Sequence, residues 1–92
     1  MSAVSNEPTS ITVEWAPIPN ARWGGQKLGY KINYKKFTET VFQERLIHPG
    51  YVTSTLTGLK PYTIYWVEVL GFNSAGDGPP EYGITKTQQG GM

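Results

Sequence analysis

Short runs of alternating apolar and polar residues constrain this chain more than any other feature of its sequence. The run SITVEW (residues 10–15) has an apolar side chain at every second position, and so does GYKINYK (residues 29–35). A period of two is typical of strands with one face in a core and the other in water. No window keeps the 3.6-residue apolar period of an amphipathic helix over more than two turns. The sequence therefore predicts an all-β fold.

Glycine and proline separate these runs at intervals of about 8–12 residues. Residues 16–29 are a long loop with two prolines and a glycine pair, and HPGY (residues 48–51) is a tight turn. The segment NSAGDGPP (residues 73–80) ends in two prolines, which cannot continue a strand ladder. Residues 38–48 alternate poorly and are predicted to form an edge strand. Short strands between such turns predict a β-sandwich or a barrel.

The composition limits what the chain can bind. One domain accounts for the 92 residues, and the absence of cysteine excludes disulfides and thiolate metal sites. The core must form by apolar packing, to which the 13% of aromatic residues contribute most. The net charge of +1 argues against nucleic acid as a partner. No apolar run approaches about 18 residues, so direct membrane insertion is not expected.

No arrangement of residues indicates catalysis. The single histidine, His48, precedes a proline in a turn, and the seven acidic residues are spread without forming a sequence-evident pair. The segment GDG (residues 76–78) is not followed by a helix that could bind phosphate. The chain is therefore predicted to be neither an enzyme nor a protein with a metal or cofactor.

An ordered set of residues resembles the fibronectin type III domain over about residues 3 to 87. The set comprises Trp15, Tyr30, Ile32, Tyr34, Leu56, Leu59, Lys60, Pro61, Tyr65, Val67, Val69, Gly71, Asn73, Gly76, Gly78, Pro79 and Thr87. The resemblance implies an immunoglobulin-like seven-stranded β-sandwich with strands A, B and E in one sheet and C′, C, F and G in the other. It implies a single domain over residues 1–87, with residues 88–92 as a tail or interdomain linker.

The resemblance also implies a core and a weak edge. Trp15 and Tyr34 are expected to fill the space between the sheets, and the Tyr65 hydroxyl to return to the backbone of the preceding crossover. The predicted core is Trp15, Ile32, Tyr34, Leu56, Leu59, Tyr65, Val67 and Val69. Strand A is short and lacks the proline-rich lead-in of the family, so poor pairing is expected. The chain is predicted to be a monomer with an edge open to association.

The strand at residues 64–73 presents large apolar side chains on both faces. If Tyr65 and Val67 point inward, then Trp66, Leu70 and Phe72 lie on the face that should meet water. In one interpretation, lysines of the neighbouring strand such as Lys31 cover these rings with their stems and ammonium groups. In the other, the apolar surface binds a protein.

A second candidate surface lies where the loops after strands B, C′ and F cluster. These loops would bring together Arg22, Trp23, Tyr51 and Asp77. Trp23 either folds back over the end of the core or is a contact residue at the tip of its loop. Adhesion modules of the family can carry the integrin ligand Arg-Gly-Asp in this loop. Here Ala75 precedes Gly76 and Asp77 in place of the arginine, so integrin binding is not predicted.

The resemblance implies a function as well as a fold. It implies a non-catalytic protein-interaction or spacer module in the extracellular part of a multidomain cell-surface adhesion molecule or receptor. The partner would be another protein or neighbouring domains of the same chain. A module of a cytoplasmic sarcomeric or scaffold protein, or an accessory domain of a secreted enzyme, are the alternatives.

Overall fold

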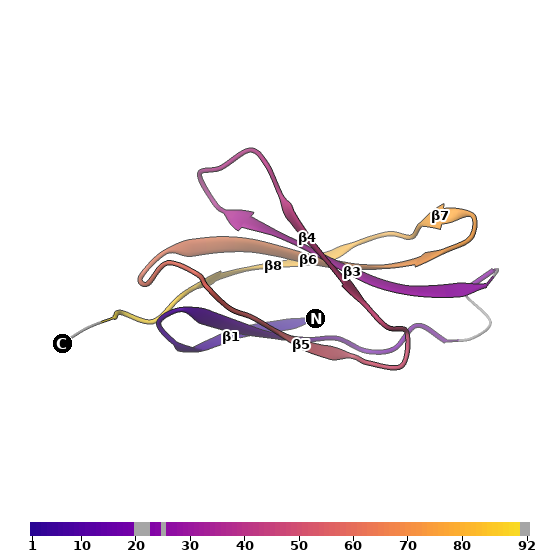
Figure 1. The fold of residues 1–92 in the computed structure, drawn as a ribbon, viewed down its shortest axis with the longest axis horizontal. Coiled ribbons are helices and arrows are strands. Elements are labelled where there is room, and N and C mark those ends of the chain that lie inside the picture. Colours follow the sequence, from indigo (N-terminus) through magenta and orange to yellow (C-terminus); the bar gives the residue numbers. More distant parts are fainter. Residues whose placement is uncertain (20–22, 25, 91–92) are drawn as a thin grey trace.

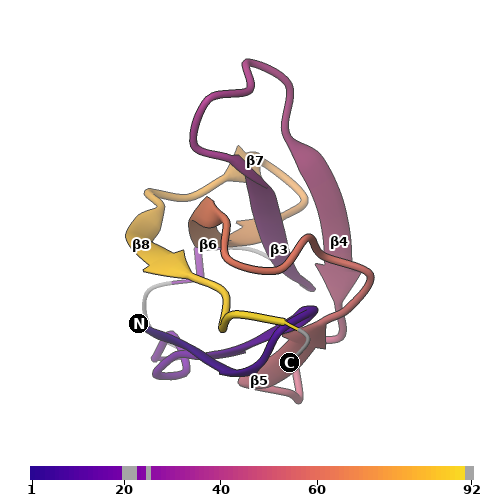
Figure 2. The same cartoon turned by 90° about the vertical axis from the view of Figure 1, so that its left-hand side faces the viewer.

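The computed structural model describes residues 1–19, 23–24 and 26–90, which form two stacked β-sheets (Figure 1). The strands are β1 (Ser2–Glu7), β2 (Ser10–Glu14), β3 (Lys27–Lys36), β4 (Gln43–Ile47), β5 (Thr53–Leu56), β6 (Ile64–Asn73), β7 (Gly76–Asp77) and β8 (Glu81–Lys86). One sheet has the order β1-β2-β5, and the other has the order β4-β3-β6-β7, with β8 also paired to β6. The end-on view in Figure 2 separates the two layers. The described part of the chain holds no helix of the length and hydropathy that a bilayer span needs.

This topology confirms the predicted sandwich with strands A, B and E facing C′, C, F and G. The poorly alternating segment does form an edge strand, β4, which pairs only with β3. Besides the seven expected strands, the segment NSAGDGPP that was predicted as a loop contains the two-residue strand β7, and Gly78, Pro79 and Pro80 separate it from β8. Proline has no backbone N–H for a ladder hydrogen bond, which explains the interruption.

The expectation that the first strand is poorly paired is wrong. β1 pairs antiparallel with β2 at Ser2, Ala3 and Val4, and again at Glu7 after a shift of register. At the shift, the buried Ser5 hydroxyl hydrogen-bonds the carbonyls of Glu7 at 2.8 Å and Ser10 at 3.0 Å. These bonds replace the ladder hydrogen bonds that the irregularity removes.

Gln88 connects the end of the chain to the same strand. Its backbone N–H donates to Ser5 Oγ at 3.2 Å, and its side-chain amide donates to the Ser5 carbonyl at 2.7 Å. The hydrogen bonds that hold the domain therefore extend one residue into the segment predicted as a tail.

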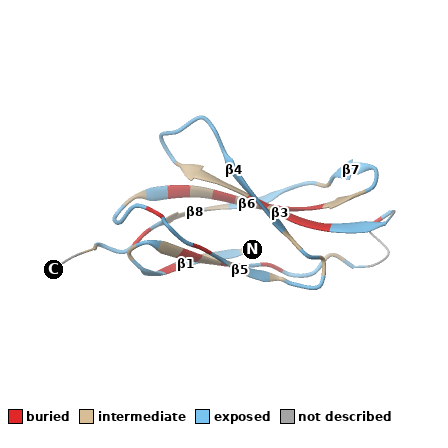
Figure 3. Cartoon of the chain, viewed as in Figure 1, coloured by how far each residue is buried: buried red, intermediate tan, exposed pale blue. Residues whose placement is uncertain are grey.

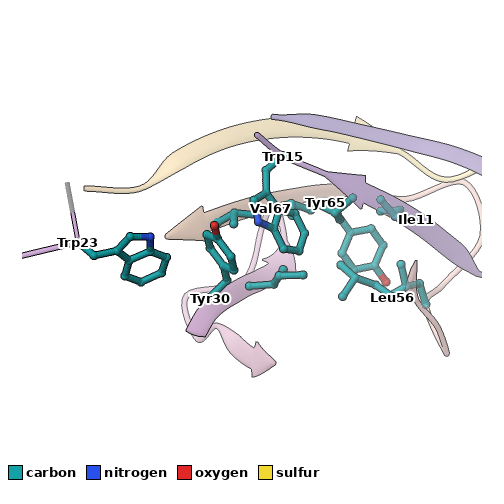
Figure 4. Packing of buried hydrophobic residues seen from close by; sticks show 11 residues of the cluster. Ile11, Trp15, Trp23, Tyr30, Leu56, Tyr65 and Val67 are labelled. Atoms are coloured by element: carbon teal, nitrogen blue, oxygen red, sulfur yellow. The ribbon is translucent and has the colours of Figure 1, made fainter. Parts of the chain in front are cut away.

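The buried positions lie on the facing sides of the two sheets (Figure 3), and the core between them combines four aromatic rings with seven aliphatic side chains (Figure 4). Tyr30 is at its centre, with the Trp15 ring centroid at 5.4 Å and that of Trp23 at 5.5 Å. The buried apolar cluster comprises Ile11, Val13, Trp15, Trp23, Tyr30, Ile32, Leu56, Leu59, Tyr65, Val67 and Val69. Tyr34 packs against this cluster but is only half-buried: it lies opposite Gln43 of the edge strand, and its hydroxyl donates to that side chain.

The crossover before β6 is fixed by two buried hydroxyl groups. The Tyr65 hydroxyl accepts the backbone N–H of Lys60 at 2.9 Å, which is the return contact implied by the family resemblance. The Thr87 hydroxyl donates to the Lys60 carbonyl at 2.7 Å and accepts the N–H of Thr63 at 2.9 Å. Lys60 is therefore held at both its N–H and its carbonyl, by Tyr65 of β6 and by Thr87, which directly follows β8.

Tyr65→Phe is expected to lower the free energy of unfolding by about 1 kcal/mol, because it removes the acceptor of a part-buried N–H. Urea denaturation of both proteins measures the change. Tyr62→Phe is the matched control: Tyr62 is exposed, and its loss should stay within about 0.5 kcal/mol. Equal losses at the two positions would contradict a structural role for the Tyr65 hydroxyl.

Candidate protein-interaction surface

The β4-β3-β6-β8 sheet has one side that faces the core and one that faces away from it, here called the outer face. Because Tyr30, Ile32, Tyr65, Val67 and Val69 point inward, the alternate residues of the same strands point outward. The outer face comprises Lys31, Asn33, Lys35, Glu44, Leu46, Ile64, Trp66, Glu68, Leu70, Phe72, Tyr82, Ile84 and Lys86.

Trp66 lies in an aromatic cluster on the outer face. Its ring stacks on that of Tyr82 with 4.7 Å between centroids and 4° between planes. The Lys35 ammonium lies 5.9 Å from the Trp66 centroid, 5.3 Å from that of Phe42 and 6.0 Å from that of Phe37. Each such contact is worth about 0.5–1 kcal/mol at an exposed site. Trp66 is therefore partly covered by its own sheet.

Leu70 and Phe72 are covered by Lys31, so Leu70 is not an exposed contact residue as one interpretation predicted. The Lys31 ammonium donates to Asp77 Oδ1 at 2.8 Å and lies 4.9 Å from the Phe72 ring centroid. Leu70, which lies directly opposite Lys31 in the ladder, is only 8% exposed. The hydrogen bond to Asp77 raises the pKa of Lys31 above its ordinary value; desolvation opposes this increase, and the charges of Asp77 and Glu44 each add a smaller increase.

Other side chains make up the exposed apolar part of the outer face. They are Leu46, Ile64, Tyr82 and Ile84, together with Phe37 and Phe42 of the β3–β4 connection, whose rings lie near the same Lys35 ammonium as Trp66; these six residues are here called the apolar patch. Tyr82 is the most prominent aromatic ring among them and is 63% exposed. Tyr82 pairs with Glu68, and Ile84 pairs with Trp66, so both residues belong to the face that the sequence indicated through β6. Alternation within β8 does not show which of its sides is the outer one; the register between β8 and β6 does.

The loop end of the sandwich differs from the predicted second surface. Trp23 is 6% exposed, its ring edge meets Tyr30, and its indole N–H donates to the Ile18 carbonyl at 3.0 Å. Of the two alternatives, Trp23 therefore folds back over the core and is not a loop-tip contact. Arg22 lies outside the described residues.

Trp23 and Asp77 do line a common groove of about 510 Å³, together with residues 71–73 and 75–81. Tyr51 is not among the lining residues; it is exposed beside His48, with 5.9 Å between the ring centroids. Asn73 links the two walls, because its Nδ2 donates to the Trp23 carbonyl and its Oδ1 accepts the N–H groups of Ala75 and Gly76. The structure thus brings two of the four predicted residues together.

The described ranges contain no cluster of three or more histidine, aspartate or glutamate side chains that could hold a metal ion. The chemical character of the outer face is instead aromatic and aliphatic, with lysines over the rings. Aromatic side chains of this kind are enriched in surfaces that bind proteins, whereas lysines are depleted there.

Comparison with known proteins agrees with this architecture. The family model of the fibronectin type III domain matches residues 1–87. Protein sidekick-2 of Mus musculus is 38% identical over 84 residues, which cover 89% of this chain and 4% of that protein. Neural cell adhesion molecule L1 of Homo sapiens is 30% identical over 90 residues, covering 89% of this chain and 7% of that protein.

Solved structures give the same result. The crystal structure of the chicken CNTN1 FN1–FN3 domains superimposes with a TM-score of 0.86 at 27% identity, over 96% of this chain and 30% of that one. The chain thus spans a small fraction of the length of its relatives, which include cell-adhesion molecules. The chain belongs to the fibronectin type III domain family.

Proposed function

We propose that the chain is a non-catalytic spacer and protein-interaction module in the extracellular part of a multidomain cell-surface adhesion molecule or receptor. The similarity to sidekick-2 and to the neural cell adhesion molecule L1 supports the cell-surface class over the cytoplasmic and enzyme-accessory alternatives. The small share of those proteins that the chain matches supports a module within a longer protein.

The course of the first and last strands supports the spacer role. The Met1 ammonium lies 2.9 Å from Glu81 at the start of β8, and Gln88, after the end of β8, hydrogen-bonds Ser5 of β1. β1 and β8 therefore run side by side in the same direction, along the long axis of a body measuring 49 × 24 × 17 Å (Figure 1). A chain that enters and leaves in one direction is suited to a linear array of domains.

The observation that carries the binding role is the position of the apolar patch outside the core. Its residues lie on the outer face, whereas the core cluster between the sheets is complete without them. If the outer face only had to meet water, polar residues would be favoured at these positions, because exposed aromatic clusters promote association. Tyr82 and Leu46 are the most exposed members of the patch on strands of the sheet.

The proposal predicts that beads coated with the chain adhere to cells that display surface proteins, and that Tyr82→Ser with Leu46→Ser abolishes adhesion. Beads are counted on cells before and after the cells are treated with protease. Tyr51→Ser is the matched control, because Tyr51 is 63% exposed like Tyr82 but lies off the outer face. Adhesion that is equal for all variants would contradict the proposal, provided that each variant unfolds at the wild-type urea concentration.

A further inference from the structure

We infer that the outer face binds the outer face of a second copy of this chain, with the two copies turned end over end. This inference rests on the proposed function, since it names the partner of the surface described above. Three properties of the face carry it: charges that form no ion pair among the described residues, the order of those charges along the strands, and the exposed apolar patch around them.

The outer face holds a cation and two carboxylates that are not paired with one another. Lys35 directs its ammonium to the Phe37 carbonyl at 3.4 Å and to three aromatic rings, with no carboxylate in ion-pair distance among the described residues. Glu68 accepts a 3.3 Å hydrogen bond from Asn33, and neither Glu68 nor Glu44 forms an ion pair in the described part of the chain. All three groups therefore have capacity for an external partner.

These charges occupy adjacent rows across the sheet. Lys35 is in register with Trp66, which is in register with Ile84. These three residues form one row across the sheet. The next row of outward side chains, displaced by two residues along each strand, contains Glu44, Asn33, Glu68 and Tyr82. The face thus presents a basic row beside an acidic row.

One two-fold arrangement matches these rows. An axis that lies in the plane of the interface, perpendicular to the strands and between the rows, turns the second copy end over end. Lys35 then faces Asn33 of the second copy, with Glu44 and Glu68 of the second copy on either side, and the same contact repeats in the other direction. An axis parallel to the strands would instead oppose each row to the same row of the second copy, so that Lys35 would face no carboxylate.

The apolar patch supplies the buried area. Strands of five, ten, ten and six residues, with about 3.3 Å per residue and about 4.8 Å between strands, give a face of about 500 Å² per copy. The roughly 1,000 Å² that two copies would bury is the size of a weak, transient interface, so a reversible dimer of micromolar to millimolar affinity is expected. Phe42 and Tyr82 provide the aromatic anchors on either side of the charged rows.

Sedimentation velocity of the purified chain from about 10 µM to 1 mM in low salt tests the inference. The wild-type chain is expected to shift from monomer to dimer over this range. Lys35→Glu and Glu68→Lys should each raise the dissociation constant at least about tenfold, because each opposes like charges. An equimolar mixture of the two variants should associate again, because unlike charges then meet. Lys60→Glu, which reverses an exposed lysine off the outer face, should leave dimerisation unchanged.

A chain that stays monomeric at 1 mM, or a dimer that is insensitive to Lys35→Glu, would overturn the inference. If the same chain still mediates bead adhesion through Tyr82 and Leu46, the proposed function stands and a different protein is the partner. A chain that neither dimerises nor adheres would overturn both. Thermal unfolding of each variant separates lost association from lost folding.

Discussion

Trp15→Ala is expected to remove about 4 kcal/mol from the free energy of unfolding, a large part of the stability of a domain of this size. Trp15 directly follows β2, is 7% exposed, and packs its ring 5.4 Å from that of Tyr30 (Figure 4). Its backbone N–H also donates to the Val52 carbonyl at 3.0 Å, which holds the chain against the segment that leads into β5. Alanine would leave a cavity between β2 and β3, and neither strand can move to close it, because each is fixed by hydrogen bonds to its neighbours in its own sheet.

The origin of this loss can be separated by a second substitution. Trp15 Nε1 is buried without a hydrogen-bond partner among the described residues, so the indole N–H contributes no stabilising bond. Trp15→Phe should therefore cost only about 1–2 kcal/mol, for the volume that is lost. Circular dichroism in urea measures both variants without depending on tryptophan fluorescence.

Trp66→Ala is the control for position. Trp66 is half-buried on the outer face and makes its contacts with Tyr82 and Lys35, so its loss should cost about 1–2 kcal/mol. A cost equal to that of Trp15→Ala would mean that the outer face belongs to the folding core. The apolar patch would then have a structural explanation and no need of a partner.

The fold follows from the alternation of side chains because a period of two fixes which face of a strand is buried. In β6, Tyr65, Val67 and Val69 are buried as the pattern predicts, and in β2 the same holds for Ile11 and Val13. The sheet order requires more than alternation, and the family resemblance supplied it. Physical reasoning from one strand does not determine which strand becomes its neighbour.

The first strand shows what alternation leaves out. The segment SAVSNE has one large apolar residue, Val4, and that side chain is exposed. Its pairing depends on Ser5, whose hydroxyl replaces lost ladder bonds and accepts the N–H of Gln88 from a distant part of the sequence. A contact between residues 83 positions apart has no local signal.

The sequence predicts which face of the sheet carries the candidate site, but not which residues are exposed on that face. Alternation assigns Trp66, Leu70 and Phe72 to the outer face, yet the reach of Lys31 to Asp77 decides that Leu70 is covered. Trp23 is a similar case, because the loop sequence does not reveal that Ile18 accepts its indole N–H. Tyr82 was overlooked because its facing depends on the register between β6 and β8. In each case the missing information is tertiary.

The remaining large effect is expected at a glycine in β3. Gly29→Ala should lower the free energy of unfolding by about 3–4 kcal/mol. Gly29 has a φ of 152°, which L-residues rarely adopt, and it follows the register shift between Lys27 and Gly29. A Cβ at this position would overlap the backbone carbonyl oxygen of Ile47, the last residue of β4, and would lie 3.4 Å from the Phe72 ring. A backbone atom cannot rotate away, so β3 and β4 would have to separate.

Gly58→Ala separates the backbone strain from the overlap. Gly58 has a φ of 71°, but a Cβ there would meet nothing within 4 Å, so its substitution should cost only about 1–2 kcal/mol. Urea denaturation of the two variants measures the difference, and equal costs would show that β4 yields without loss. Because β4 carries Leu46 and Glu44, a shift of this strand would also disturb the outer face. The folded fraction of Gly29→Ala is therefore expected to dimerise more weakly than that of Gly58→Ala, which connects the geometry of one glycine to the surface proposed for binding.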